Sequence, residues 1–165
     1  MTCDSKELER AATKVVELCC AKGLTVSTAE SCTAGLVAAS IAAVPGASDI
    51  LRGGAVTYVN DIKERVLGVA HASIEEYTEV SHPVAREMAS GACTLFGTDI
   101  AVSLTGYAGP GGGTAENPVG TVYVGIARDG AADSIRVHFL GDRNEVRRQA
   151  TLCALNLIAS CVEDL

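Results

Sequence analysis

The residues from Thr28 to Gly35 place a hydroxyl, a thiol and a carboxylate next to one another where the chain changes from a strand to a helix. A short β-rich run precedes Ser31, and an apolar pattern with helical spacing begins at Leu36. A serine hydroxyl at such a junction lies near backbone N–H groups that stabilise a developing oxyanion. The position suits acyl transfer with Ser31 as the nucleophile, but a serine that only caps the helix would show the same pattern.

Two further reactive side chains, Tyr58 and Lys63, follow the next extended run. A serine nucleophile needs a proton acceptor, and the histidines are poorly placed to be one because they fall in an expected surface loop, a helix start and a late strand. These three residues are His71, His82 and His138. Lys63 can act as the base only if its pKa falls from about 10.4 toward 7 or 8, which requires roughly 4 kcal/mol of desolvation or like-charge repulsion. A solvated lysine paired with Asp61 or Glu64 is the alternative.

A glycine-rich segment follows the apolar strand expected at residues 100–104. It starts at Thr105 and contains Gly106, Gly109, Gly111 and Gly112. Glycines allow the backbone to approach a ligand closely and to point successive N–H groups at an anion. The segment is neither a Walker motif nor a dinucleotide fingerprint, because no Lys-Ser/Thr pair and no helical pattern follow it. We expect a ligand-binding loop here, with a flexible turn as the alternative.

Arg143 and Arg147 stand at the start of the last expected helix. Their i, i+4 spacing puts them on one helix face. Guanidinium groups bind phosphate or carboxylate bidentately, so both arginines are candidates for binding an anionic part of a substrate. A solvated helix start bridged to Asp142 and Glu145 would use the same residue types.

Helical and extended patterns alternate along the chain and position these groups. Apolar spacing predicts helices over residues 5–22, 36–42, 82–96 and about 143–161, and a short helix that carries Lys63. Extended runs predict strands over residues 24–28, 55–59, 100–104, 121–127 and 134–139, the last two forming a hairpin. This order predicts a three-layer α/β/α sandwich with a mixed β-sheet, in a single domain over residues 1–165.

Composition limits the classes of partner and compartment. The 165 residues carry a formal charge of -7, so we expect neither nucleic acid nor membrane partners. No apolar run approaches the roughly 20 residues that span a bilayer. The seven cysteines include no CxxC pair and no metal-ligand spacing, which predicts free thiols, no metal site and a cytoplasmic location.

Five segments taken in order resemble the CinA C-terminal domain family, which includes nicotinamide mononucleotide deamidases. The segments are TAESCTAG, GGAVTYVNDIK, LTGYAGPGGG, NPVGTVYVGIA and GDRNEVRRQA, and they cover nearly the whole chain. The resemblance implies the three-layer fold and the hydrolysis of nicotinamide mononucleotide to nicotinic acid mononucleotide and ammonia, without a cofactor. It also fits a small-molecule pyridine nucleotide as partner, and small α/β enzymes of this kind often form homo-oligomers.

The resemblance also implies roles for individual residues. Ser31 corresponds to the nucleophile, Lys63 to its base and Tyr58 to a proton-handling or orienting group. The remaining positions correspond to substrate-binding residues: Glu30, Cys32, Thr33, Thr105, Gly106, Gly109, Gly111, Gly112, Arg143 and Arg147. Three positions depart from the family pattern, with Ala34 in place of a glycine, His82 in place of an acid and Tyr107 in place of an isoleucine.

Two other functions fit the same sequence. The chain could be a non-catalytic nucleotide-binding regulatory module, because Tyr107 borders the expected pocket and could narrow it or change the substrate. It could also be a thiol enzyme that uses Cys32, which is adjacent to Ser31 at a helix start where thiolates are stabilised.

Overall fold

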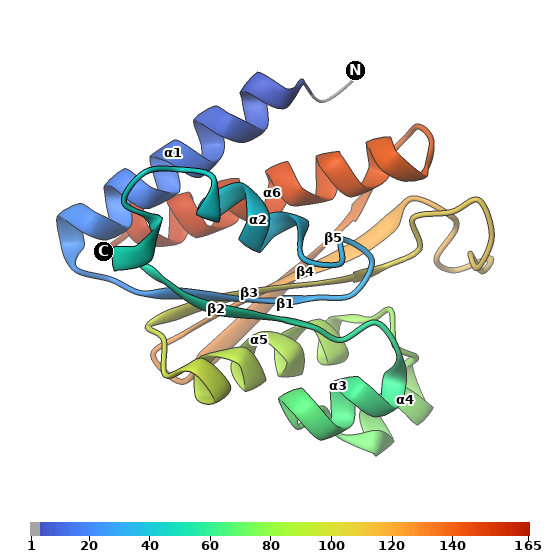
Figure 1. Ribbon diagram of the computed structural model, residues 1–165. Helices are drawn as coiled ribbons and strands as arrows, with labels where there is room; N and C mark the ends of the chain where they lie inside the picture. Colours follow the sequence, from blue (N-terminus) through green and yellow to red (C-terminus); the bar gives the residue numbers. More distant parts are fainter. Residues whose placement is uncertain (1–3) are drawn as a thin grey trace.

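Five strands and six α-helices make up the part of the chain that the computed structural model describes, residues 4–165 (Figure 1). The strands are β1 (Val26–Glu30), β2 (Leu51–Val56), β3 (Ile100–Gly106), β4 (Thr121–Arg128) and β5 (Ala131–His138). The helices are α1 (Ser5–Lys22), α2 (Leu36–Ala42), α3 (Asn60–Leu67), α4 (His71–Tyr77), α5 (His82–Phe96) and α6 (Arg143–Glu163), with one 3₁₀ turn, η1 (Ala47–Asp49).

The strands form one mixed sheet in the order β2-β1-β3-β4-β5. β1 pairs in parallel with both β2 and β3, whereas β3, β4 and β5 pair in antiparallel fashion. The carboxyl ends of β1, β2 and β3 therefore lie at the same edge of the sheet, and the segments that follow them meet there. Ligands bind at this edge in open α/β sheets.

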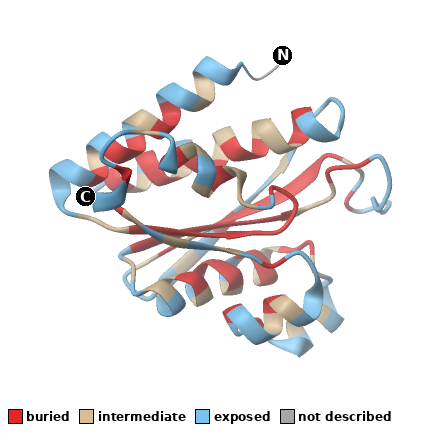
Figure 2. Cartoon of the chain, viewed as in Figure 1, coloured by how far each residue is buried: buried red, intermediate tan, exposed pale blue. Residues whose placement is uncertain are grey.

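Helices cover both faces of the sheet, which confirms the expected three-layer fold. Figure 1 shows α1, α2 and α6 on one face and α3, α4 and α5 on the other. The larger apolar core joins the first group to the sheet through residues such as Val15, Ile41 and Leu155. A second core lies under α5 around Met88 and Val84. Figure 2 shows buried residues concentrated along the strands and on the helix sides that face them.

The structure corrects the expected position of β2, which lies at Leu51–Val56 and not at residues 55–59. Its two glycines, Gly53 and Gly54, are sites of close packing. A Cβ added to Gly53 would lie 2.6 Å from the ring of Phe96, so only glycine fits under that ring. After Val56 the chain leaves the sheet, and Tyr58 and Val59 are about half exposed.

Two other expectations need smaller corrections. His71 is the first residue of α4 and not part of a loop, and its side chain is exposed beside Glu64 and Glu75. β1 starts and ends two residues later than expected, so that Glu30 is its last residue. Because of this shift, Ser31 directly follows the strand.

The α2 N-terminus is bound by the carboxylate of Glu30. This side chain is fully buried, and its two oxygens accept hydrogen bonds from the backbone N–H groups of Gly35, Val37 and Ala38 at 2.9 to 3.1 Å. The bonds satisfy N–H groups that a helix start leaves without partners. Glu30 thus fixes the turn that contains Ser31.

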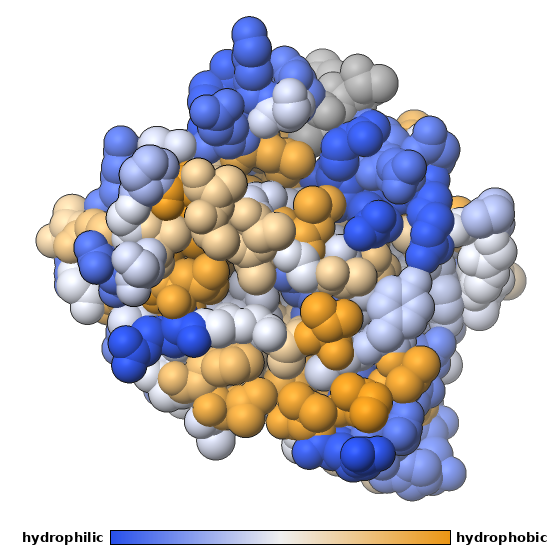
Figure 3. All heavy atoms as spheres, in the orientation of Figure 1, coloured by the Kyte–Doolittle hydropathy of each residue, from blue (hydrophilic) through white to orange (hydrophobic). Residues whose placement is uncertain are grey.

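Large apolar side chains remain exposed at several places, among them Val56, Val59, Val66 and Leu140. Figure 3 shows apolar side chains gathered over the lower part of one face of the molecule. Among residues 4–165, no helix is both long and apolar enough to cross a membrane. The homo-oligomer, the cytoplasmic location and the single domain over residues 1–165 stay predictions.

Replacing Glu30 by alanine should lower the free energy of unfolding by at least about 3 kcal/mol. The change leaves three backbone N–H groups of α2 without their acceptor, and each buried unsatisfied donor costs roughly 1 to 3 kcal/mol. Urea unfolding of Glu30→Ala measures the loss. The matched change Glu17→Ala, at an exposed position of α1, should alter stability by no more than about 0.5 kcal/mol. Equal stability of the two variants would contradict this role of Glu30.

Candidate active site

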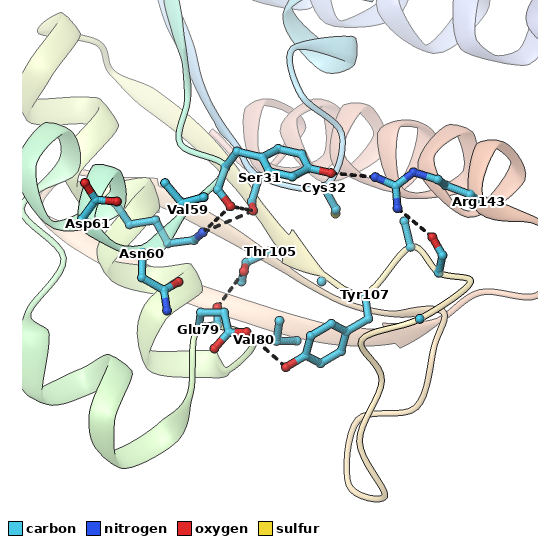
Figure 4. Close-up of a pocket in the computed structure, with 16 residues that line it drawn as sticks. Ser31, Cys32, Val59, Asn60, Asp61, Glu79, Val80, Thr105, Tyr107 and Arg143 are labelled. Atoms are coloured by element: carbon cyan, nitrogen blue, oxygen red, sulfur yellow. Dashed lines mark hydrogen bonds between the residues drawn. The ribbon is translucent and has the colours of Figure 1, made fainter.

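A cavity of about 430 Å³ opens at the carboxyl edge of the parallel strands (Figure 4). Segments that follow β1, β2 and β3 contribute to its wall, together with the start of α6 and the segment between α4 and α5. The lining residues are Ser31, Cys32, Tyr58, Val59, Asn60, Asp61, Lys63, Glu79, Val80, Thr105, Gly106, Tyr107, Ala108, Gly109, Gly111 and Arg143. The cavity therefore combines residues from most of the motifs identified in the sequence.

Ser31 occupies the first position after β1. Its backbone N–H donates to the carbonyl of Leu104 at 2.9 Å, which holds it against β3. Its Oγ lies 3.2 Å from Nζ of Lys63 and 3.5 Å from the carbonyl oxygen of Tyr58. The hydroxyl thus faces both the cavity and an amine within hydrogen-bond reach, as a nucleophile paired with a base requires.

Lys63 lies on α3 and is only 1% exposed. Besides Ser31, its Nζ contacts the carbonyl oxygens of Thr57 at 3.0 Å and Tyr58 at 3.5 Å. Burial lowers the pKa of Lys63 from its ordinary value of 10.5, while the charges of Glu79 and Cys32 act in the opposite direction. A neutral amine donates two hydrogens to the two carbonyls, which directs its lone pair to the hydroxyl of Ser31.

Tyr58 contacts the reacting pair through its backbone and not through its phenol. Its carbonyl oxygen lies beside Ser31 and Lys63, whereas its ring is 51% exposed. The phenol oxygen accepts a hydrogen bond from Arg143 Nη2 at 2.6 Å, and Arg143 Nη1 donates to the carbonyl of Gly109 at 2.7 Å. In this geometry Tyr58 orients Arg143, which in turn holds the glycine loop.

The glycine-rich loop forms the wall beyond β3. Gly106, Gly109 and Gly111 line the cavity, and Gly109 has a φ of 87°, a conformation that favours glycine. Thr105 also lines the cavity, but its hydroxyl donates to the carbonyl of Glu79 at 2.6 Å. Thr105 therefore ties the segment between α4 and α5 to the end of β3.

Four residues that the sequence placed in the substrate site are not on the cavity wall. Glu30 is buried under α2, and Thr33 is buried in the turn after Ser31. Arg147 donates to the carbonyl oxygens of Cys32 and Thr33, both at 3.0 Å, so it braces the Ser31 turn. Gly112 packs against the ring of Tyr107, and a Cβ added to Gly112 would be 3.4 Å from that ring. These contacts support the site from outside the cavity.

Cys32 lines the cavity, but its surroundings favour the protonated thiol. Burial, together with the nearby charge of Glu30, raises the pKa of Cys32 to about 11. Arg147 and Lys63 act in the opposite direction without reversing the effect. Because the thiolate is the reactive form, this environment does not support a thiol nucleophile.

Glu79 and Val80 are the cavity residues that the sequence did not suggest, and Glu79 is the charged one. It precedes α5 and reaches the site only because Thr105 and Tyr107 hold the segment, with the phenol of Tyr107 3.3 Å from its carboxylate. Glu79 belongs to none of the motifs at the strand ends, so the sequence around it does not indicate that it lines the site.

The histidines take no part in the cavity. His82 contacts Ser134 Oγ at 2.8 Å and the ring of Tyr123, whereas His71 and His138 belong to α4 and β5. In the described part of the chain, no group of three or more His, Cys, Asp or Glu side chains is arranged to hold a metal ion. The six described cysteines are free thiols, and Cys3 lies outside the described residues.

Comparisons with known proteins agree with this fold. The family model "CinA C-terminal domain" matches residues 8–162. A CinA-like protein of Anaeromyxobacter sp. (strain K) is 47% identical over 144 residues, 87% of this chain and 35% of that protein. This chain spans little more than a third of the length of such curated relatives.

Solved structures match over almost the whole chain. The competence/damage inducible protein CihA from Agrobacterium tumefaciens has a TM-score of 0.92 at 36% identity, with 97% of this chain and 98% of that chain covered. A competence-damaged protein (CinA) superfamily protein from Klebsiella pneumoniae 700603 has a TM-score of 0.92 at 33% identity, with 96% and 99% covered.

The buried amine predicts a pH-dependent contribution to stability. The pKa of Lys63 is lower in the folded than in the unfolded chain, so between these two values the unfolded state binds more protons and the free energy of unfolding rises with pH. Urea unfolding between pH 7 and 10 should show wild type gaining stability relative to Lys63→Met as the pH rises toward 10.5. Ser31→Ala keeps the amine and should keep the wild-type dependence. A difference between wild type and Lys63→Met that stays constant over this range would contradict the burial effect.

Proposed function

The chain belongs to the CinA C-terminal domain family, and we propose that it hydrolyses the carboxamide of nicotinamide mononucleotide to nicotinic acid mononucleotide and ammonia. The observation that carries the proposal is the 3.2 Å contact between Ser31 Oγ and the buried Nζ of Lys63 in the cavity. A serine with an adjacent desolvated amine is suited to acyl transfer without a histidine.

The reaction starts with the neutral amine of Lys63. It accepts the hydroxyl proton of Ser31 while Oγ bonds to the amide carbon, which gives a tetrahedral oxyanion. The resulting ammonium then gives its proton to the amide nitrogen, the C–N bond breaks, and ammonia leaves an acyl-enzyme. Water then hydrolyses the acyl-enzyme by the same steps. Lys63 accepts a proton from water while the water oxygen bonds to the acyl carbon. The bond from that carbon to Ser31 Oγ then breaks, and Lys63 returns the proton to Ser31.

The oxyanion needs donors other than the α2 N-terminus. The N–H groups of Gly35, Val37 and Ala38 are already bound to Glu30. We assign the oxyanion to the backbone N–H of Cys32, the residue after the nucleophile on the cavity wall. The helix start thus supports the reaction by fixing the turn and not by direct contact with the substrate.

We assign binding of the substrate phosphate to Arg143. A guanidinium has five N–H donors, and Arg143 uses one of them on Gly109 and one on Tyr58. The remaining donors can bind an anion next to the glycine loop, whose backbone adds further N–H groups. Arg147 already donates to the carbonyl oxygens of Cys32 and Thr33, so we do not assign phosphate binding to it.

A non-catalytic nucleotide-binding module is the second candidate. Tyr107 lines the cavity, where its ring occupies space that a smaller side chain would leave to a ligand. In that case the chain would bind a pyridine nucleotide tightly and release no ammonia.

Ser31→Ala should abolish ammonia release from nicotinamide mononucleotide. Loss of the nucleophile removes the acyl-enzyme route, so we expect kcat to fall at least about a thousandfold. The assay follows ammonia and nicotinic acid mononucleotide, with circular dichroism to confirm that the variant is folded. Release by the native chain that persists in Ser31→Ala would exclude Ser31 as the nucleophile. Binding without release by the native chain would favour the regulatory module.

Cys32→Ser should keep most of the activity, within about tenfold of wild type. The thiol is held protonated by burial, and serine is close to it in size, so the turn after Ser31 is preserved. The same assay and a melting curve check this variant. A loss as large as that of Ser31→Ala in a folded protein would show that the thiol takes part in the reaction.

A further inference from the structure

Glu79 places a carboxylate on the cavity wall that the proposed reaction does not use. The residue is partly buried, and its carboxylate accepts a hydrogen bond from the phenol of Tyr107 at 3.3 Å. Over residues 4–165, no lysine, arginine or histidine nitrogen lies within 4 Å of this carboxylate. A partly desolvated carboxylate that has no cation in direct contact is stabilised when a cationic ligand binds beside it.

The backbone at Glu79 is fixed before any ligand binds. Thr105 donates to the carbonyl of Glu79 at 2.6 Å, and Asn117 donates to the carbonyl of Val80 at 3.2 Å. The preceding Thr78 has a φ of 68°, which a β-branched residue adopts only when its surroundings hold it there. Ser81 supports that conformation by donating to the carbonyl of Thr78 at 2.9 Å. The carboxylate is therefore carried by a preorganised segment.

The cavity has separate cationic and anionic sides. Figure 4 shows Arg143 beside the glycine loop, and Glu79 next to Tyr107 on the other side of Thr105 from Ser31. Nicotinamide mononucleotide has the same separation of charge, because its ring nitrogen is positive when joined to ribose and its phosphate is negative. With the phosphate at Arg143, the second charge of the ligand needs an anionic or aromatic contact elsewhere on the wall.

We propose that Glu79 and Tyr107 form a cation subsite that binds the pyridinium ring of the substrate and so selects carboxamides carried by a positively charged ring. The inference rests on the proposed function for the identity of the ligand. The Glu79 carboxylate supplies the counter-charge, and the Tyr107 ring supplies a π face for the cation.

If Glu79 acted only by changing the pKa of Lys63, the expected results would differ. The charge of Glu79 raises the pKa of Lys63 against the effect of burial. If this were its only role, Glu79→Gln would lower the pKa of Lys63 and move the acid limb of the kcat profile to lower pH. It would then change the affinity for charged and neutral rings by the same factor.

Binding to Ser31→Ala, which cannot turn the ligand over, tests the subsite. Calorimetry compares nicotinamide mononucleotide with its 1,4-dihydro form, which keeps the carboxamide, ribose and phosphate but has a neutral ring. Adding Glu79→Gln should weaken binding of the cationic ligand about tenfold and of the neutral one by less than about twofold. Equal weakening of both ligands, unchanged binding of both, or no binding of the cationic ligand to Ser31→Ala would overturn the proposal.

Asp61→Asn is the matched control. It removes the same charge from the same cavity wall, but the Asp61 carboxylate is mostly exposed and lies 3.6 Å from Arg65. We expect less than about a twofold change for either ligand, and a charge-selective loss equal to that of Glu79→Gln would overturn a specific subsite. Ammonia release is measured separately on the native chain. Absence of release together with Glu79-dependent selection of the cationic ring would reject the proposed hydrolysis and keep the subsite.

Discussion

The buried amine of Lys63 is held between two backbone carbonyls, which accept its hydrogen bonds, and the Ser31 hydroxyl, which lies 3.2 Å from Nζ. Those carbonyls belong to Thr57 and Tyr58, where the chain has left β2 but not yet entered α3. The position of that segment is set by the parallel pairing of β1 with β2, continued by the bond from Thr57 N–H to the carbonyl of Glu30 at 2.9 Å. The register of the sheet therefore determines both the burial of Lys63 and the orientation of Ser31.

The turn around Ser31 is fixed by charge at two points outside the cavity. Glu30 accepts three N–H groups of α2 from one side, and Arg147 donates to two carbonyls of the turn from the other. Both residues look like ligand-binding groups in a sequence, because carboxylates and guanidinium groups next to a nucleophile often touch substrate. In the structure their polar atoms are used by the backbone. The Ser31 hydroxyl therefore faces the cavity without any movement of the turn.

The α/β/α fold could be predicted from the sequence because α1 and α5 have clear apolar spacing and β3 is a nearly continuous apolar strand. The cavity residues that follow β1, β2 and β3 were also predictable, since parallel strands end at one edge of a sheet. The position of β2 was not, because Gly53 and Gly54 interrupt its apolar pattern and are explained only by tertiary packing, Gly53 against Phe96 and Gly54 against Thr28 and Ala38. Glu79 could not be found either, because only tertiary hydrogen bonds from Thr105 and Tyr107 bring its segment to the site.

The net charge of the chain does not describe the charges that line the cavity. The chain carries a formal charge of -7, yet the lining includes Arg143 and a buried amine as well as Glu79 and Asp61. At 0.15 M ionic strength, exposed charges more than about 8 Å apart are largely screened, whereas charges on a partly desolvated wall interact more strongly. Affinity for a small anionic ligand therefore depends on the few groups within contact distance of it. Arg143 donates to the carbonyl of Gly109 and the carbonyl of Glu79 accepts from Thr105, so the cavity presents groups of opposite charge on segments that are fixed by hydrogen bonds.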